Sequence, residues 1–303
     1  MLARTEEKFQ AGLAGSLSEA TAIQSLLSGL FDYAGLYPPA GLSLQCAASN
    51  YLDYASGKHA SALGKFIINS DRLEEFRSVV GDSVKQFRLS VIVPESDALD
   101  EALRAVGGDA TIDTAEIKLA GLQGFEQMSA KFSNSITTYV EIPFAPSGFD
   151  ALSVVSDLGM RAKIRMGGVV PEAFPSVPDV VRMLSELAKL RLPFKATAGL
   201  HHPIRSIQPL TYKAQSARGT MHGFINLCCA AAVLYFGGDE SDAEKVLLEE
   251  DATAWKIDRG SLGWRHLKWT RDQLTRLRRE FFVSIGSCSF KEPIEDLRTI
   301  GWL

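Results

Sequence analysis

The stretch MRAKIRMGGVVPEAFPSVPDVVRMLSELAKLRLPFKATA, residues 160–198, contains the pattern that decides the fold. It begins with a strand-like run at 160–165 and ends with another at 193–198. Between them, Ser176 can cap a helix that has Pro178 in its first turn. The apolar residues of this helix fall on one face: Val177, Val180, Val181, Leu184 and Leu187. A strand, a single-stripe helix and a second strand predict two parallel strands joined by an outer helix.

Similar β-rich runs precede this unit along the chain. They lie at 30–34, 63–68, 87–93, 112–119 and 137–142, which makes seven predicted strands in all, with room for a helix between most of them. A helix is expected near residues 18–29, before the first strand. Another follows Ser96 and ends at Gly107, with apolar residues at helical spacing: Leu99, Ala102, Leu103 and Val106.

One more strand would close a (β/α)8 TIM-like barrel, which is the predicted fold class, α/β. The segment 221–227 stands at about the right interval for the eighth strand, although it could instead begin a helix that runs to Phe236. A rival eighth strand is FFVSIG, residues 281–286. The alternative fold is an open doubly wound parallel sheet, but the stretch LFDYAGLYPPA, which holds the first strand and the turn after it, lacks GxGxxG.

The alternation of strands and helices stops beyond Gly238. The sequence therefore predicts a barrel over 1–238 and a C-terminal helical and hairpin appendage over 239–303 that packs on the barrel. The appendage would hold an acidic helix at 241–250, a hairpin at 253–264, a basic amphipathic helix at 271–280 and a tail. The charged run of the basic helix is typical of a solvated helix face.

Composition excludes several classes of function. The 303 residues include 46% hydrophobic and 22% charged residues, with a net charge of −4 and no long basic run, so neither nucleic acid nor an anionic membrane surface is an expected partner. No signal peptide is evident, and the most apolar run is too short for a membrane span. Four cysteines without CxxC spacing suit reduced thiols, and the expected location is the cytoplasm. Whether the chain forms a homo-oligomer stays open.

Polar residues gather at the predicted strand ends. In a barrel these ends meet at one face, where active sites form. Side chains two apart on a strand share a face, so Lys163 with Arg165, and Lys195 with Thr197, should converge on the barrel mouth. The other candidates at strand ends are Asp32, Glu116, Lys118 and Glu141.

Lys163 and Lys195 occupy matching places on consecutive strands. Neighbouring strands lie ~4.8 Å apart, so two ammonium groups at ~5 Å would repel by about 3 kcal/mol at an effective dielectric of about 20. One lysine could then be neutral near pH 7 and act as a nucleophile toward carbonyl carbon, with Glu116 or Glu141 as proton shuttle. The equally weighted alternative is a cluster of three cations, Lys163, Arg165 and Lys195, that binds a phosphate or carboxylate. A third alternative turns both lysines outward into surface salt bridges.

Glycines and histidines complete the candidate site. Gly167 and Gly168 suit a tight turn whose N–H groups face an anion. His201 and His202 follow the seventh strand; because adjacent residues in extended chain point apart, one of them is expected to contact substrate or move a proton. His222 and Asn226 lie one helical turn apart if that stretch is a helix, so both could face the site or cap the core. No HExxH or HxH spacing favours a metal, so a metal-dependent hydrolase ranks third and no cofactor is expected.

The lysine pair resembles that of the class I aldolase barrels of the deoxyribose-phosphate aldolase type. That family carries its Schiff-base lysine in a K-T-S-T-G stretch on strand six and a second lysine in a K-A-S-G-G-like stretch on strand seven. The corresponding stretches here are AKIRMGG (162–168) and FKATAGL (194–200). The resemblance covers strands four to seven and implies that Lys163 forms the Schiff base, that Lys195 lowers its pKa, and that Glu116 replaces the family's strand-four aspartate.

This chain departs from the aldolase family's pattern within these motifs. The first motif keeps only the lysine and a later glycine, and Arg165 stands where the family has a small hydroxyl residue. The stretches FDYAGLYPPA, KATAGLHHP and GSCSF also resemble a set of bacterial proteins, which implies no activity. The predicted function is that of an aldolase-type lyase acting on a small carbonyl compound with an anionic group. The alternative is a non-covalent anion-binding barrel: a transferase, an isomerase or a metabolite-binding protein.

Overall fold

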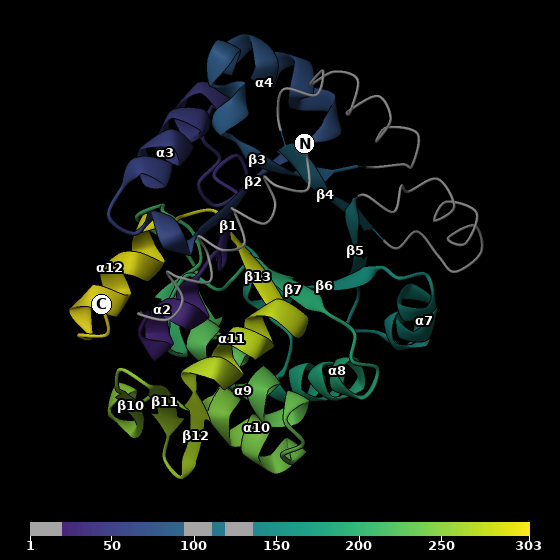
Figure 1. Cartoon of the computed structure of the whole chain (residues 1–303), viewed down its shortest axis with the longest axis vertical. Coiled ribbons are helices and arrows are strands. Elements are labelled where there is room, and N and C mark those ends of the chain that lie inside the picture. The colour runs from purple at the N-terminus through teal and green to yellow at the C-terminus, as the bar shows by residue number, and fades with distance from the viewer. Residues whose placement is uncertain (1–19, 94–110, 119–135) are drawn as a thin grey trace, which may run out of the picture.

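Eight parallel strands form a closed barrel with helices around it (Figure 1). The computed structural model describes residues 20–93, 111–118 and 136–303. The strands follow one another around the barrel in the order β1-β13-β7-β6-β5-β4-β3-β2. Closure confirms the predicted (β/α)8 TIM-like barrel and excludes the open doubly wound sheet.

All seven strands predicted before residue 200 are present, within one or two residues of the predicted bounds. They are β1 Phe31–Tyr33, β2 Leu63–Asn69, β3 Arg88–Ile92, β4 Thr111–Lys118, β5 Thr137–Ile142, β6 Arg161–Arg165 and β7 Phe194–Thr197.

The eighth strand is β13, Phe282–Ser287, which pairs in parallel with both β1 and β7. The strand predicted at 221–227 was therefore wrong, and the rival FFVSIG run was right. Residues 218–221 form the short strand β9 outside the barrel, and helix α9, Phe224–Tyr235, follows. An apolar run of this length is compatible with a buried helix or a buried strand, and periodicity alone does not separate them.

The identity of the eighth strand also changes the predicted domain boundary. Residues 239–303 include the strand that closes the barrel, so a boundary at 238 falls inside the barrel's own sequence. The segment between β7 and β13 is a long crossover. It contains the hairpin β8 Ser206–Pro209 and β9 Arg218–Met221, helices α9 and α10 Glu240–Leu248, and an antiparallel sheet of β10 Trp255–Ile257, β11 Ser261–Trp264 and β12 Leu267–Thr270.

The remaining helices pack around the strands (Figure 1). The α-helices are α2 Ala22–Leu27, α3 Leu44–Ser56, α4 Leu73–Val80, α7 Pro146–Asp157, α8 Val177–Lys189, α11 Arg271–Glu280 and α12 Lys291–Thr299. Short 3-10 helices are η1 Ala60–Ala62, η2 Ser70–Arg72, η3 Gly81–Gln86, η4 Pro171–Ala173 and η5 Ala252–Ala254. The helix expected from Ser96 to Gly107 lies outside the described residues.

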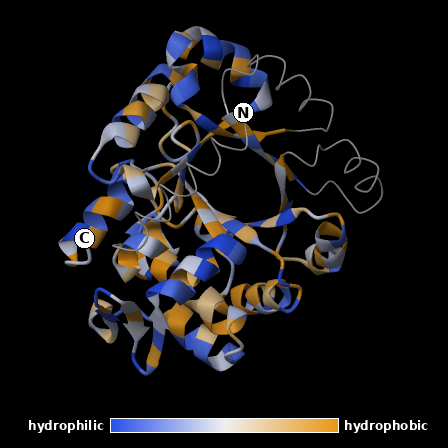
Figure 2. Ribbon diagram, in the orientation of Figure 1, coloured by the Kyte–Doolittle hydropathy of each residue, from blue (hydrophilic) through white to orange (hydrophobic). Residues whose placement is uncertain are grey.

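Helix α8 forms where its sequence predicts it. The Ser176 hydroxyl accepts a hydrogen bond from the Asp179 N–H, and Pro178 lies in the first turn, where a proline ring costs no hydrogen bond. Every predicted apolar position of this helix is buried. Apolar residues also fill the strands and the inner faces of the other helices (Figure 2), so the main core is the shell between barrel and helices.

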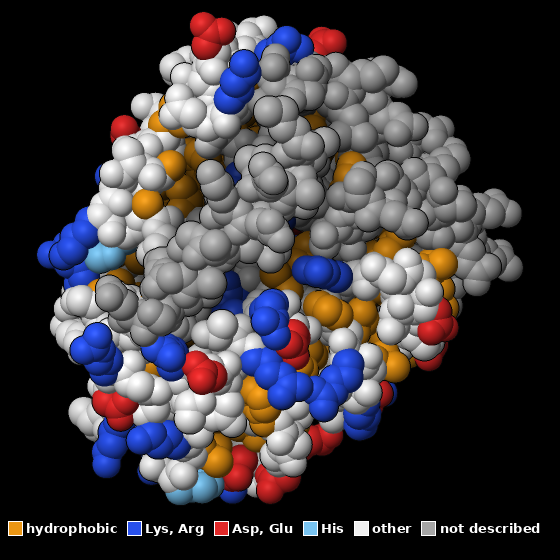
Figure 3. All heavy atoms as spheres, in the orientation of Figure 1, with side chains coloured by type: hydrophobic (Ala, Val, Ile, Leu, Met, Phe, Trp, Pro, Cys, Tyr) orange, Lys and Arg blue, Asp and Glu red, His pale blue; other side chains and the backbone are white. Residues whose placement is uncertain are grey.

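Helix α11 covers the barrel beside α2 and β13, and its charged run is largely exposed as predicted. Lys and Arg side chains alternate with acidic ones over this part of the surface (Figure 3). Arg278 is an exception, because it is buried and donates to the carbonyl oxygens of Leu26, Ser28, Phe282 and Val283. None of the helices in the described ranges combines the length and apolar composition that a bilayer crossing needs.

Candidate functional site

Lys195 lies inside the barrel, in the middle of β7, and its side chain is fully buried. Its Nζ donates to Asp32 Oδ2 at 2.6 Å and to Glu116 Oε1 at 2.7 Å. Asp32 is on β1 and Glu116 on β4, neither of which borders β7. Contacts between strands that are not neighbours are possible only across the barrel interior, so the interior at this level is filled by an ion-pair network.

Glu116 joins the two lysines. Its Oε1 accepts from Lys195, and its Oε2 lies 2.8 Å from Lys163 Nζ. Ser90 donates to the same carboxylate at 2.7 Å. Lys163 and Lys195 are paired residues in the register of β6 and β7, as predicted, and Glu116 reaches both from β4 across the barrel interior.

The network continues outward from Lys163 toward solvent. Lys163 Nζ lies 3.0 Å from Glu141 Oε2, and Arg165 Nε donates to Glu141 Oε1 at 3.0 Å. Exposure rises along this path, from a 6% exposed side chain at Lys163 to 49% at Arg165. The chain of alternating charges thus runs from Asp32 in the interior to Arg165 at the rim, with three cations and three anions.

This pairing corrects the expectation of mutual repulsion for Lys195, whose charge is decided by its carboxylate partners. Burial lowers the pKa of Lys195, but the carboxylates of Asp32 and Glu116 outweigh it and raise the pKa above its ordinary value. Burial likewise raises the pKa of Glu116, and the two ammonium groups lower it by more, so this carboxyl stays ionised. Lys195 is therefore a fixed positive charge beside Lys163.

A cavity of about 370 Å³ opens at the carboxyl ends of the strands. Of the predicted residues, Glu116, Lys163, Arg165, Gly168, Thr197, His201 and His202 line it. Pro38 and Pro39 of the loop after β1 and Tyr212 of the segment after β8 line it as well. The cavity is large enough for a small metabolite and lies where barrel enzymes place their active sites.

Seven predicted residues do not line this cavity. Asp32, Lys195 and Glu141 belong to the ion-pair network around it. Lys118 is exposed at the end of β4, and Gly167 packs so closely against Phe174 and Gly199 that a Cβ would overlap both. The other two, His222 and Asn226, have structural contacts elsewhere.

His222 and Asn226 form hydrogen bonds that hold the crossover segment in place, and neither lines the cavity. His222 Nε2 lies 2.9 Å from the Pro175 carbonyl oxygen. Asn226 accepts from the Arg205 N–H and donates to the carbonyl oxygens of Val246 and Glu249. Asn226 is fully buried, and these bonds tie α9 to the end of α10.

Both neighbouring histidines face the cavity, so the expectation that one of the two would point away was wrong. Each uses its Nδ1 toward a carboxylate of α12: His201 at 2.7 Å from Glu292, and His202 at 2.6 Å from Asp296. The alternation of an extended chain does not apply, because these residues lie in the turn after β7. Within the described residues, no group of three or more His, Cys, Asp and Glu side chains is arranged to hold a metal ion.

The cavity residues that the sequence did not predict include Tyr212, Cys288 and Glu292. Cys288 directly follows β13. Had FFVSIG been taken as the eighth strand, the rule that strand ends carry function would have placed this cysteine in the mouth. Tyr212 and Glu292 carry no comparable signal, because the crossover and α12 bring them to the site.

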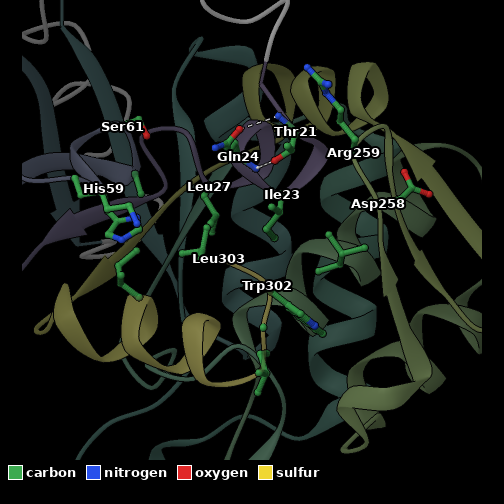
Figure 4. Close-up of a pocket in the computed structure, with 16 residues that line it drawn as sticks. Thr21, Ile23, Gln24, Leu27, His59, Ser61, Asp258, Arg259, Trp302 and Leu303 are labelled. Atoms are coloured by element: carbon green, nitrogen blue, oxygen red, sulfur yellow. Dashed lines mark hydrogen bonds between the residues drawn. The ribbon is translucent and has the colours of Figure 1, made fainter.

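A larger cavity of about 920 Å³ lies away from this network (Figure 4). It is bounded by α2, the residues just before β2, the β10–β11 turn and the C-terminal residues Trp302 and Leu303. The segments before β1 and β2 belong to the opposite end of the barrel from the mouth. Thr21 and Gln24 there cap α2 reciprocally, which is a structural role. The candidate site is therefore the smaller cavity.

Comparisons with known proteins do not identify a function for this cavity. No protein-family model and no curated protein matches the chain. Among solved structures, it is similar to a glycerophosphoryl diester phosphodiesterase from Parabacteroides distasonis ATCC 8503, with 8% identity and a TM-score of 0.31. The match covers 44% of this chain and 46% of that one, so this chain spans less than half the length of the protein it matches. At this TM-score the likeness carries no argument, and the closed barrel itself establishes the fold.

Proposed function

We propose that the protein is an aldolase-type lyase in which Lys163 forms a Schiff base with a small carbonyl compound. The observation that carries the proposal is the pairing of Lys163 with Lys195 across neighbouring strands, with one carboxylate, that of Glu116, in contact with both ammonium groups. Lys163 lines the cavity, whereas Lys195 is fully buried beneath it. Lys163 is thus the lysine that a substrate can reach.

The network supplies the groups that this chemistry needs. A proton moves from Lys163 Nζ to Glu141 Oε2, 3.0 Å away. The neutral amine then attacks the carbonyl carbon, and Glu141 gives its proton to the departing hydroxyl group, so that water leaves and an iminium remains. The adjacent carbon–carbon bond breaks, the iminium accepts its electron pair to become an enamine, and Glu141 accepts the hydroxyl proton of the fragment that leaves as a carbonyl compound. Lys195 places a second positive charge at the matching position of the neighbouring strand.

Arg165 is suited to bind the anionic group of the substrate. Its side chain is half exposed at the cavity and contacts only one carboxylate oxygen in the network, Glu141 Oε1. By contrast, Lys163 and Lys195 each contact two carboxylates. This distribution favours the Schiff base over a clamp in which all three cations bind the anion.

Borohydride trapping tests the proposal directly. The protein is incubated with a panel of aldehydes, ketones and keto acids, reduced, and analysed by intact mass and peptide mapping. We expect a stable adduct on Lys163 that is absent from Lys163→Met and retained in Lys189→Met, a change at an exposed lysine of α8. No adduct with any compound, or an adduct on surface lysines alone, would reject the Schiff base and favour non-covalent anion binding.

A further inference from the structure

A cysteine, a histidine and a glutamate meet at the cavity beside the lysine network. Cys288 Sγ lies 3.5 Å from His201 Nε2, and His201 Nδ1 lies 2.7 Å from Glu292 Oε2. The three residues come from the end of β13, the turn after β7 and the first turn of α12. All three line the cavity. A nucleophile, a base and a third group that orients the base are the components of nucleophilic catalysis.

We propose that Cys288, His201 and Glu292 form a second reactive centre, a thiol nucleophile that takes the acyl group of a small activated ester or thioester. Its nucleophile, its base and the group that orients the base differ from those of the proposed Schiff-base chemistry, and its reaction does not depend on that chemistry. Lys163 and Arg165 line the same cavity, so acyl groups that carry a carboxylate or phosphate fit best.

The hydrogen bonds fix the histidine in the orientation that this role requires. With Nδ1 directed at the Glu292 carboxylate, Nε2 is left to face the thiol. Burial lowers the pKa of His201, while its hydrogen bonds with Cys288 and Glu292 raise it, to about 10 in balance. The imidazole therefore carries a proton at neutral pH and can donate it from Nε2 during the reaction.

Two neighbouring features support the same centre. Tyr212 Oη donates to Glu292 Oε2 at 2.8 Å and lies 3.8 Å from Cys288 Sγ. Cys288 also lies just before the N-terminus of α12, whose first turn is tied back by a hydrogen bond from the Glu292 N–H to Ser289 Oγ. The positive end of a helix dipole favours negative charge at that position.

The other three cysteines, all within the described residues, lack such surroundings. Cys228 and Cys229 are buried in α9, and burial raises the pKa of both, to about 12 for Cys228. Cys46 is exposed on α3, where the side-chain amide of Asn50 lies 3.9 Å from its sulfur. Cys46 therefore serves as an internal reference for the reactivity of an ordinary thiol.

The reaction balances with the groups present. The Cys288 thiolate attacks the acyl carbon, a carbon–sulfur bond forms, and the bond to the leaving oxygen or sulfur breaks. The His201 imidazolium gives its Nε2 proton to the leaving group. Water then attacks the resulting thioester while Nε2 accepts its proton, so that the carboxylic acid leaves and the imidazolium–thiolate pair is restored.

Acylation with p-nitrophenyl acetate tests the proposal. We expect one acetyl group on Cys288 at pH 7, removable by hydroxylamine and formed at least about tenfold faster than on Cys46 in the same sample. Peptide mapping separates it from any acetyl group on lysine. The adduct should disappear in Cys288→Ser and persist in Cys46→Ser. His201→Asn should slow its formation at least about tenfold, whereas His266→Asn, at an exposed histidine 3.5 Å from Asp242, should not.

A second measurement uses the unaltered chain and so does not depend on the folding of any variant. At pH 7, iodoacetamide should alkylate Cys288 at least about tenfold faster than Cys46, although Cys288 is buried and Cys46 is exposed. Alkylation or acetylation of Cys46 as fast as that of Cys288 would overturn the proposal. Borohydride trapping addresses Lys163 separately, so either chemistry can fail alone.

Discussion

The environment of a single residue, Lys195, explains why a lysine can stand in the middle of a buried strand. An unpaired ammonium there would cost several kcal/mol. Two carboxylates, from Asp32 and Glu116, offset that cost, and Ser284 adds a hydrogen bond of 2.7 Å to Asp32. Both partners lie far from Lys195 in the sequence, so its pairing follows from the closure of the barrel.

Replacing Lys195 by methionine should destabilise the protein by about 3–5 kcal/mol, because two buried carboxylates lose their shared partner. The measurement is the free energy of unfolding from urea denaturation followed by circular dichroism. The matched control is Lys189→Met, which removes an exposed lysine paired with Glu186 and should leave the midpoint nearly unchanged. Equal effects of the two substitutions would show that the interior network does not carry this stability.

His201 should make stability depend on pH in the alkaline direction. Its folded-state pKa, about 10, lies above the unfolded value of about 6.5, so the stabilisation is complete below pH 6.5 and is lost as pH rises toward 10. In wild type, under reducing conditions, the free energy of unfolding should fall most steeply above about pH 8.5, where an unfolded cysteine has also lost its proton, by up to about 1.4 kcal/mol per pH unit. His201→Asn should remove that slope and His266→Asn should keep it. An unchanged slope in His201→Asn would assign the pH dependence to other groups.

At the scale of the element, packing rather than propensity decides what a segment becomes. Residues 224–235 form a helix that is buried almost all round, since alanine and cysteine fit between α8, α10 and α11 without cost to helical geometry. FFVSIG combines aromatic and β-branched residues with a glycine, which suits a strand between two neighbours. Local sequence left either segment free to supply the eighth strand, and contacts with the rest of the barrel selected FFVSIG.

Gly148 in α7 provides a test in which propensity and packing oppose each other. Alanine is favoured over glycine in a helix by about 1 kcal/mol. A Cβ at residue 148, however, would overlap the carbonyl oxygen of Pro143 and press on Ile142. We expect Gly148→Ala to destabilise the protein by about 1–2 kcal/mol in urea denaturation, since overpacking outweighs propensity.

The control lies in the same helix. Ser153 is exposed, and Ser153→Ala should be neutral or slightly stabilising by its propensity alone. A stabilised Gly148→Ala variant would mean that the end of β5 can shift away from α7 at little cost.

At the scale of the molecule, closure depends on the last part of the chain. β13 pairs with β1 on one side and β7 on the other, and the loop after it carries Cys288 into the mouth. A chain that ends at residue 238 would leave the edges of β1 and β7 unpaired and expose the inner face of the sheet. The C-terminal segment is therefore part of the barrel and part of the candidate site.

Truncation tests this dependence. We expect residues 1–238 to form no rigid barrel, with loss of the near-ultraviolet circular dichroism signal and of a cooperative urea transition. The full-length chain, prepared in parallel, is the reference. A cooperative transition and an ordered aromatic signal in the truncated chain would show that another segment can replace β13.

The sequence by itself determined the fold class, the seven strands before residue 200 and the pairing of Lys163 with Lys195. These features rest on local patterns: period-two runs, capped helices with one apolar face, and the equal place of the two lysines on consecutive strands. Only the tertiary structure decided the eighth strand, the carboxylate partners of the lysines and the contact of Cys288 with His201. These involve groups as far apart in sequence as Asp32 and Lys195, and barrel closure, not local pattern, brings them within hydrogen-bonding distance.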